Sequence, residues 1–178
     1  MKWWKSKLEE LLEKAIKGDE QSFTEIFMQL NDELYKIART RLACEYDIDD
    51  AIQETMIEVY YSLKKLKHTE YFKTWTIKIL INKCNKIYKK RKKENISYKE
   101  NFFELYIEDI KQKDIENNVD FYILIKDLNY NERIAIVLYY IIGYKTKEIS
   151  KILRVNENTV KARLSRSKQK IKKYIKEA

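Results

Sequence analysis

The chain contains no proline, two glycines, two cysteines and one histidine among its 178 residues. The strongest helix breakers are therefore almost absent, so we expect most of the chain to be helical. Cys44, Cys84 and His68 stand alone, in no CxxC or zinc-ligand spacing, and no histidine base can be assigned to a nucleophile. We therefore expect no metal site, no cofactor, no enzymatic activity and no small-molecule substrate.

Long apolar runs are also missing. No stretch of about 18 apolar residues exists that could span a bilayer. The first twenty residues, MKWWKSKLEELLEKAIKGDE, lack the uninterrupted apolar core and small-residue cleavage site of a secretory signal. We therefore expect a cytoplasmic protein.

Positive charge is what the chain has in excess: 37 Lys and Arg against 28 Asp and Glu, a net charge of +9. Such a surface suits a polyanion such as nucleic acid, although a merely solvated charged surface has the same composition. The charge is unevenly spread, with +5 over residues 1–93, −5 over 94–127 and +9 over 128–178. This asymmetry predicts two domains, 1–94 and 120–178, joined by a flexible acidic linker, 95–119.

Apolar residues recur at helical spacing in both predicted domains. The fold class that we predict is all-α, with two small helical domains. Gly18 should end the first helix, Asp19 should cap the second and Asp47 should begin the third. The expected helices span 5–17, 20–43, 47 to about 66, and 69–93 in the first domain, and 120–128, 130–142, 146–154 and 157–176 in the second.

The last two helices match a helix-turn-helix pattern. In TKEISKILRVNENTVKARLSRS (146–167), Val160 and Leu164 would face inward, and Asn156 would cap the last helix. Its outward side chains are suited to the DNA major groove: Thr159, Lys161, Ala162, Arg163, Ser165, Arg166 and Lys168. Two other interpretations of a basic helix are a solvated helical hairpin and a membrane-surface helix, but the apolar residues beyond Leu164 are too sparse for the latter.

The predicted helix 69–93 is strongly basic, with nine Lys and Arg and no acid from Lys73 to Lys93. Trp75 is expected to pack inward rather than to stack on a base, together with Phe72, Ile79 and Leu80. Polar side chains on one face of a rigid helix, beside aromatic residues, suit single-stranded or melted DNA. The candidate contacts are Lys67, His68, Tyr71, Lys73, Lys78, Asn82, Lys86, Lys89 and Lys90.

The segment 46–66 carries an acidic face, with Asp50, Gln53, Glu54 and Glu58 outward and an apolar face that includes Met56 inward. An acidic face would repel DNA, so it should meet either solvent or a basic protein partner.

Taken in order, these segments resemble an extracytoplasmic-function (ECF) sigma factor of the bacterial sigma-70 family. DIDDAIQETM resembles the family's D-A-x-D-x-x-Q-E-x-F, with Met56 in place of the aromatic residue. FKTWTIKILIN resembles F-x-x-W-L-x-x-I-A-x-N, and EISKIL with TVKARLSRS resembles E-I-A-x-x-L with T-V-K-S-R-L-x-R-A. The chain has Leu128-Asn129 where the family usually has Leu-Pro, and a bulky Arg154-Val155 in the turn.

The resemblance implies roles for each segment. Asp49 and the acidic face described above would dock on core RNA polymerase. Residues 67–73 and the helix after them would open and hold the −10 promoter element. The last helix would bind the −35 element. It also implies an anti-sigma factor, which can be membrane-bound, as a partner. Two alternatives stay open: a helix-turn-helix regulator that acts without polymerase, and a polymerase-binding module that does not recognise promoters.

Overall fold

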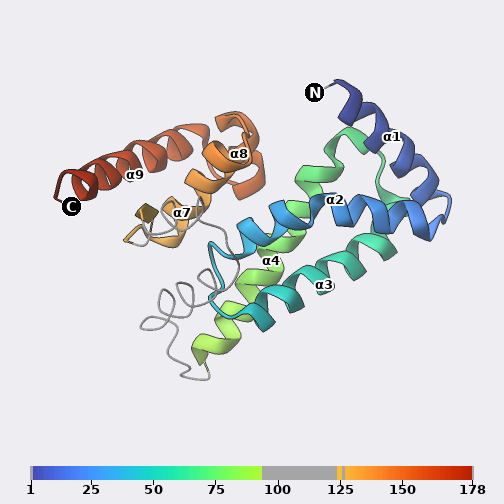
Figure 1. The fold of residues 1–178 in the computed structure, drawn as a ribbon, viewed down its shortest axis with the longest axis horizontal. Coiled ribbons are helices and arrows are strands. Elements are labelled where there is room, and N and C mark those ends of the chain that lie inside the picture. The colour runs from blue at the N-terminus through green and yellow to red at the C-terminus, as the bar shows by residue number, and fades with distance from the viewer. Residues whose placement is uncertain (1, 94–123, 126, 178) are drawn as a thin grey trace.

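The structure, a computed structural model, describes residues 2–93, 124–125 and 127–177, which form helices and no strand. The first group of helices is α1 (Lys2–Ile16), α2 (Glu20–Ala38), α3 (Glu45–Ser62) and α4 (Phe72–Lys93), with short 3₁₀ turns η1 (Leu63–Lys65) and η2 (Thr69–Tyr71) before α4. The second group is α7 (Tyr130–Ile136), the π-helical turn η3 (Val137–Ile141), α8 (Thr146–Leu153) and α9 (Glu157–Glu177). The predicted all-helical fold is confirmed; the predicted linker and most of the predicted helix 120–128 lie outside the described residues (Figure 1).

Local sequence signals set several helix ends as predicted. Gly18 ends α1 in the left-handed region, with φ of +102°, which a residue without a Cβ adopts at little cost. The Asp19 carboxylate then accepts a hydrogen bond from the Ser22 amide at 3.2 Å and so caps α2. The start of the last helix is set in the same way, because Oδ1 of Asn156 accepts from the Asn158 amide at 2.8 Å.

The predicted start of the third helix at Asp47 is wrong. α3 begins at Glu45, and Asp47 lies in its first turn, where its side chain is only 3% exposed. The Arg91 guanidinium donates to the Asp47 carboxylate from Nη2 at 2.6 Å and from Nε at 3.2 Å. Asp47 therefore fastens the beginning of α3 to the end of α4, a tertiary role that a capping pattern cannot show.

Large aliphatic and aromatic side chains from α2, α3 and α4 fill the core of the first group, among them Leu30, Ile48, Val59, Phe72 and Leu80. The inward placement that we predicted for Phe72, Ile79 and Leu80 is confirmed. Met56 does not point inward as expected, because 39% of it is exposed. Cys84 is buried in this core, and burial raises the pKa of its thiol to about 12.

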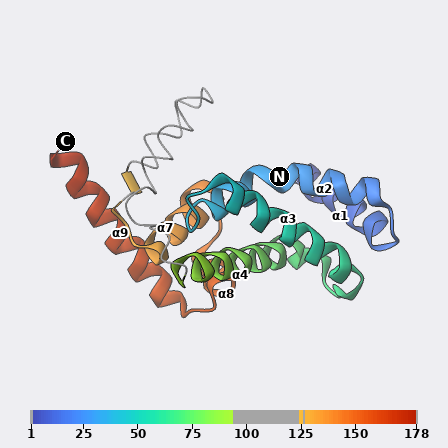
Figure 2. The ribbon, with the colours of Figure 1, turned by 90° about the horizontal axis from the view of Figure 1, so that it is seen from below.

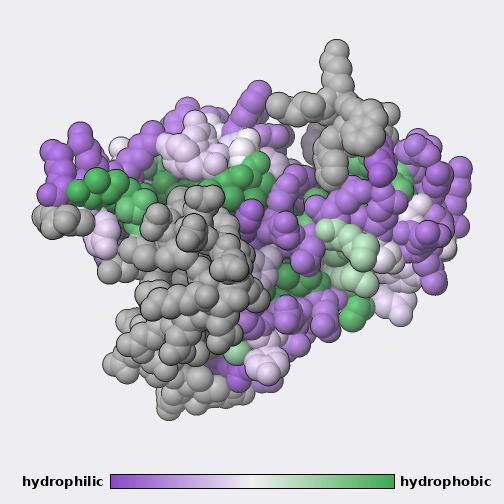
Figure 3. All heavy atoms as spheres, viewed as in Figure 1, coloured by the Kyte–Doolittle hydropathy of each residue, from purple (hydrophilic) through white to green (hydrophobic). Residues whose placement is uncertain are grey.

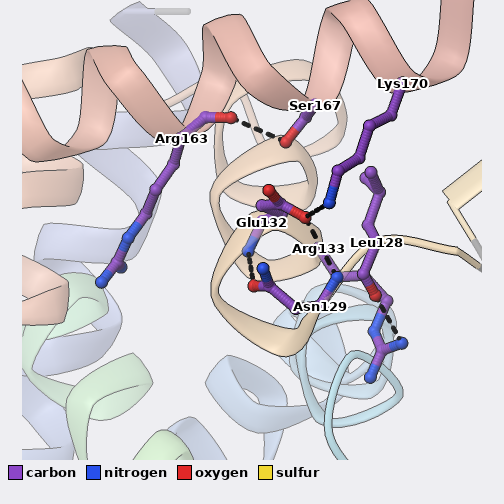
Figure 4. A network of polar contacts seen from close by, with 7 residues as sticks. All are labelled: Leu128, Asn129, Glu132, Arg133, Arg163, Ser167 and Lys170. Atoms are coloured by element: carbon purple, nitrogen blue, oxygen red, sulfur yellow. Dashed lines mark hydrogen bonds and ion pairs between the residues drawn. The ribbon is translucent and has the colours of Figure 1, made fainter.

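A polar network fastens α9 to α7 in the second group (Figure 4). Asn129, at the position where the resembled family usually has proline, accepts from the Glu132 amide, and the Glu132 carboxylate accepts from the Asn129 amide, both at 3.1 Å. This capping box satisfies two amides at the start of α7. Nζ of Lys170 on α9 donates to the nearly buried Glu132 carboxylate at 2.8 Å.

The two groups are packed against each other in the described structure. α8 lies beside α4, and η3 contacts α2 (Figures 1 and 2). Their buried apolar residues belong to one continuous core cluster. Nothing in the sequence pattern indicates this packing of the two predicted domains.

Candidate nucleic-acid and protein interfaces

α8 and α9 form the predicted helix-turn-helix. Ile149, Ile152, Val160 and Leu164 are buried, which confirms the inward placement predicted for Val160 and Leu164. The Thr146 hydroxyl donates to the Glu157 carboxylate at 2.7 Å and links the starts of the two helices, and this bond and Lys161 lower the pKa of Glu157. The turn between them holds Arg154 in the left-handed region, with φ of +53°, an unusual conformation for a residue with a Cβ.

The outward side chains of α9 differ in what they touch. Ala162, Ser165 and Arg166 are exposed, whereas Thr159 is half-buried. Lys161 is exposed but forms an ion pair with Glu157 at 3.1 Å. Lys168 lies over the Tyr140 ring, 5.5 Å from its centroid, and their hydrogen bond raises the pKa of Lys168.

Arg163 is different, because it is half-buried and extends from α9 away from the α7 network in Figure 4. It lines a groove together with Lys78 and Asn82 of α4 and Tyr130 of α7. Burial lowers the pKa of its guanidinium, and the neighbouring Arg166 lowers it further. The predicted −35 contact therefore faces the predicted −10 helix.

A second, larger groove borders the loop between α3 and α4. Of the predicted −10 contacts, Lys67, His68, Tyr71 and Lys78 line it, and Trp75 lies partly buried against the core at its wall. The His68 ring lies 6.0 Å from the Tyr71 ring, edge to face, and its Nδ1 is 3.2 Å from Glu70. Glu148 and Lys151 of α8 line the same groove.

The other predicted −10 contacts lie elsewhere. Lys73 is half-buried and forms an ion pair with Glu33 of α2 at 2.7 Å. Lys86, Lys89 and Lys90 are exposed on the second half of α4 and line neither groove described above. The structure thus brings together Lys67, His68, Tyr71 and Lys78 and leaves the distal lysines as an exposed basic extension.

The predicted acidic face of α3 is exposed at all its positions: Asp49, Asp50, Gln53, Glu54 and Glu58. Two of its carboxylates share one cation, because Nζ of Lys83 on α4 lies 2.8 Å from Glu58 and 3.3 Å from Glu54. The hydrogen bond to Glu58 raises the pKa of Lys83. Both glutamates remain 47% exposed, so this pairing orients them without covering them.

Apolar side chains on the same face were missed by the sequence analysis. Ile57 is 55% exposed and Tyr61 77% exposed. Their spacing from Glu54 and Glu58 places all four on one side of the helix, as an acidic and apolar stripe. The sequence does contain a signal for them, because large apolar residues occur on both sides of α3. A helix that buries only one face does not need apolar residues on the other.

The described residues on the face drawn in Figure 3 are mostly hydrophilic. On the face drawn in Figure 3, apolar side chains gather in patches separated by hydrophilic ones. Each helix in the described part of the chain is too short or too polar to span a bilayer. Within the same residues, no three His, Cys, Asp or Glu side chains are grouped so that they could hold a metal ion.

Comparison with protein families finds two matches that follow the two groups of helices. Residues 26–94 match sigma-70 region 2, and residues 121–171 match sigma-70 region 4. The first range contains the acidic face of α3 and all of α4, and the second contains the helix-turn-helix.

Similar proteins span nearly the whole chain. The ECF RNA polymerase sigma factor SigM of Mycobacterium tuberculosis is 23% identical over 93% of this chain and 83% of its own length. SigW of Bacillus subtilis, also an ECF RNA polymerase sigma factor, is 24% identical over 96% of this chain and 100% of its own. Among solved structures, CnrH in complex with the cytosolic domain of CnrY shares the fold, with a TM-score of 0.68 at 20% identity over 93% of this chain and 95% of that one.

Proposed function

Because the chain belongs to the sigma-70 family, as an ECF sigma factor, we propose that it binds core RNA polymerase and directs it to promoters by recognising their −10 and −35 elements. The observation that carries this proposal is the combination of the acidic and apolar stripe on α3 with a helix-turn-helix in the same chain. A protein that only binds DNA has no use for that stripe, since it would repel phosphate.

The stripe is the proposed polymerase-docking surface. Exposed carboxylates would steer the chain to a basic protein surface, and Ile57 and Tyr61 would lose their contact with water in the complex. Asp49, Asp50 and Gln53 extend the surface towards the start of α3.

The groove beside the α3–α4 loop is the proposed site for the melted −10 element. Lys67 and Lys78 would bind phosphate, and Tyr71, which is 54% exposed, offers a ring on which a base can stack. The exposed lysines Lys86, Lys89 and Lys90 would continue the phosphate contacts along α4.

The first half of α9 is the proposed −35 contact. Arg163 and Arg166 would bind base edges in the major groove, and Lys161, Ser165 and Lys168 would contact the backbone beside them. The capped start of the helix adds oriented amides that favour phosphate.

We also propose the domain division 1–94, 95–119 and 120–178, a cytoplasmic location and the absence of covalent chemistry. A regulatory partner fits the same picture, because a structural relative, the sigma factor RpoE of Bartonella quintana, was solved in complex with the anti-sigma factor NepR. We propose an anti-sigma factor as the inhibitor of this chain.

Charge reversal on the stripe tests the polymerase-docking surface. Glu54→Lys should weaken binding of the labelled chain to core polymerase by about tenfold or more, because a like charge would then face a basic partner. Glu13→Lys is the matched control: Glu13 is exposed on a different helix, α1, and the same change in charge there should leave the affinity unchanged.

Equal affinity of the Glu54→Lys variant and the wild type would remove α3 from the docking surface. Tight binding of the free chain to one operator, with no effect of core polymerase, would favour a stand-alone regulator instead. Inhibition of transcription without any new start site would favour a polymerase-binding module.

A further inference from the structure

We propose that Lys170 and Glu132 are positioning residues for −35 recognition: their ion pair sets the rotation of α9 about its own axis and thereby the direction in which Arg166 points. The Lys170 ammonium serves this pair instead of a DNA phosphate. The inference rests on the proposed function, because it concerns the contact assigned there to the first half of α9.

The pair is asymmetric in its burial. Nζ of Lys170 lies 2.8 Å from the Glu132 carboxylate, and the Glu132 side chain is 4% exposed whereas that of Lys170 is 49% exposed. Figure 4 shows Lys170 reaching from α9 to Glu132 on α7. A buried carboxylate has lost its contact with water and needs donors from the protein. Glu132 therefore depends on Lys170 more than Lys170 depends on Glu132.

A second donor to Glu132 belongs to the backbone and fixes the carboxylate in place. The Asn129 amide donates to Oε2 of Glu132 at 3.1 Å, and the same oxygen accepts from Lys170. The Glu132 amide donates in return to Oδ1 of Asn129, so the carboxylate is part of the capping box at the start of α7. Lys170 thus pairs with an acceptor that is fixed on α7. The pair holds only while the side of α9 that carries Lys170 is turned towards it.

Another polar contact holds the beginning of α9. The Thr146 hydroxyl donates at 2.7 Å to the carboxylate of Glu157, the first residue of the helix. Glu157 and Lys170 are about 20 Å apart along the helix axis. Between them, buried apolar side chains hold α9 on its domain, but apolar contact is not directional. The two polar contacts therefore fix what the apolar contacts leave free, which is the rotation of α9.

Arg166 lies on the side of α9 that the pair controls. It precedes Lys170 by about one helical turn, so the two side chains leave the helix in similar directions. A bidentate contact with a base requires the guanidinium to be aligned with the base edge. Phosphate contacts carry no sequence information and depend mainly on charge. A rotated α9 would therefore lose sequence preference before it loses affinity for DNA.

Binding of the polymerase complex to labelled duplexes tests the positioning role. Lys170→Met keeps the length of the side chain but removes the cation. It should lower the preference for a cognate −35 sequence over a scrambled one by about fivefold or more, the lower end of the value of a direct base contact. Lys170→Arg, which keeps a cation for Glu132, should retain the preference. An unchanged preference in folded Lys170→Met would overturn the proposal.

The salt dependence of binding separates the pair from a phosphate contact. The full chain without polymerase is titrated with a duplex of mixed sequence at several salt concentrations. Each phosphate contact contributes about −0.9 to the slope of the logarithm of affinity against the logarithm of salt concentration. Lys172→Ala should make the slope shallower by about this amount, whereas Lys170→Met should leave it unchanged. An equal change in both variants would make Lys170 a phosphate contact and overturn the proposal.

A double-mutant cycle tests whether Glu132 is the partner through which Lys170 acts. Glu132→Gln removes the negative charge, while the Gln oxygen can still accept from the Asn129 amide. It should lower the −35 preference as Lys170→Met does, and the double variant should lose no more than either single variant, because all three lack the same pair. Additive losses would contradict the pairing. Circular dichroism checks folding, and if Glu132→Gln is not folded, Lys170→Met and Lys170→Arg decide.

The wild type separates failure of this proposal from failure of the proposed function. A wild-type polymerase complex that binds cognate and scrambled duplexes equally contradicts the proposed function. A wild type with a clear preference, together with a Lys170→Met variant that keeps it, contradicts the positioning role alone.

Discussion

Two arginines on the same side of α9 differ in their exposure to solvent. Arg166 is exposed, whereas Arg163, three residues earlier, is half-buried against α4. Arg166→Ala in the polymerase complex should lose about 1–3 kcal/mol of preference for the cognate −35 sequence, the value of a direct contact to a base pair. Competition between cognate and scrambled duplexes measures that preference.

Lys172→Ala is the contrasting variant, because Lys172 is exposed further along α9 and would contact phosphate only. It should weaken binding to all sequences alike and leave the preference intact. A uniform loss in Arg166→Ala as well would contradict base contact by Arg166.

Arg154 offers a stability test at the same scale. Its φ of +53° costs energy in any residue with a Cβ, and its side chain is exposed. Arg154→Gly should therefore raise the free energy of unfolding by about 0.5–1 kcal/mol. Urea unfolding measures this free energy. Lys151→Gly, inside α8, is the contrasting variant and should instead lower the free energy of unfolding by about 1 kcal/mol.

The roles of single residues could be predicted where they depend only on neighbours in the sequence. Gly18, Asp19 and Asn156 follow from capping rules that involve only their neighbours in sequence, and all three are confirmed. The predictions for Asp47 and Met56 were wrong. For Asp47 the cause is a distant residue, because Arg91, 44 residues away, donates to its buried carboxylate. A local pattern does not contain that partner.

At the scale of helices, the ion pair between Asp47 and Arg91 fixes α3 on α4. Asp47→Asn should lower the free energy of unfolding by about 2–3 kcal/mol, because a neutral amide replaces the buried carboxylate that accepts from the Arg91 guanidinium. Asp50→Asn, at an exposed position on the same helix, should change it by less than about 0.5 kcal/mol. Equal effects of the two substitutions, measured by urea unfolding, would contradict the role of this pair.

The sequence pattern predicted the positions of the helices well but did not predict which helices pack against each other. The absence of proline and the apolar spacing led to α1, α2, α4, α8 and α9 with shifts of a few residues at their ends. The contact of α8 with α4 could not be predicted, because both helices carry basic residues that favour separation. Between the same two groups of helices, the Arg41 guanidinium lies over the rings of Tyr88 on α4 and Tyr130 on α7, and no periodicity indicates such a contact.

For the whole molecule, the surfaces proposed for polymerase and for DNA lie on different helices and carry opposite charge. The acidic and apolar stripe on α3 is exposed, and so are the basic side chains of Lys86, Lys89 and Lys90 on α4 and of Arg166 on α9. This separation would let one chain with a net charge of +9 approach a basic protein surface with α3 and DNA with α4 and α9.

Transcription with mapped start sites tests the promoter-specific function most directly. Purified chain and core polymerase are incubated with fragments of the source genome, and the 5′ ends of the transcripts are determined. We expect new start sites that share two sequence elements near −10 and −35, that require the chain, and that become less selective at −35 with Arg166→Ala. Start sites identical to those of core polymerase alone would contradict the account.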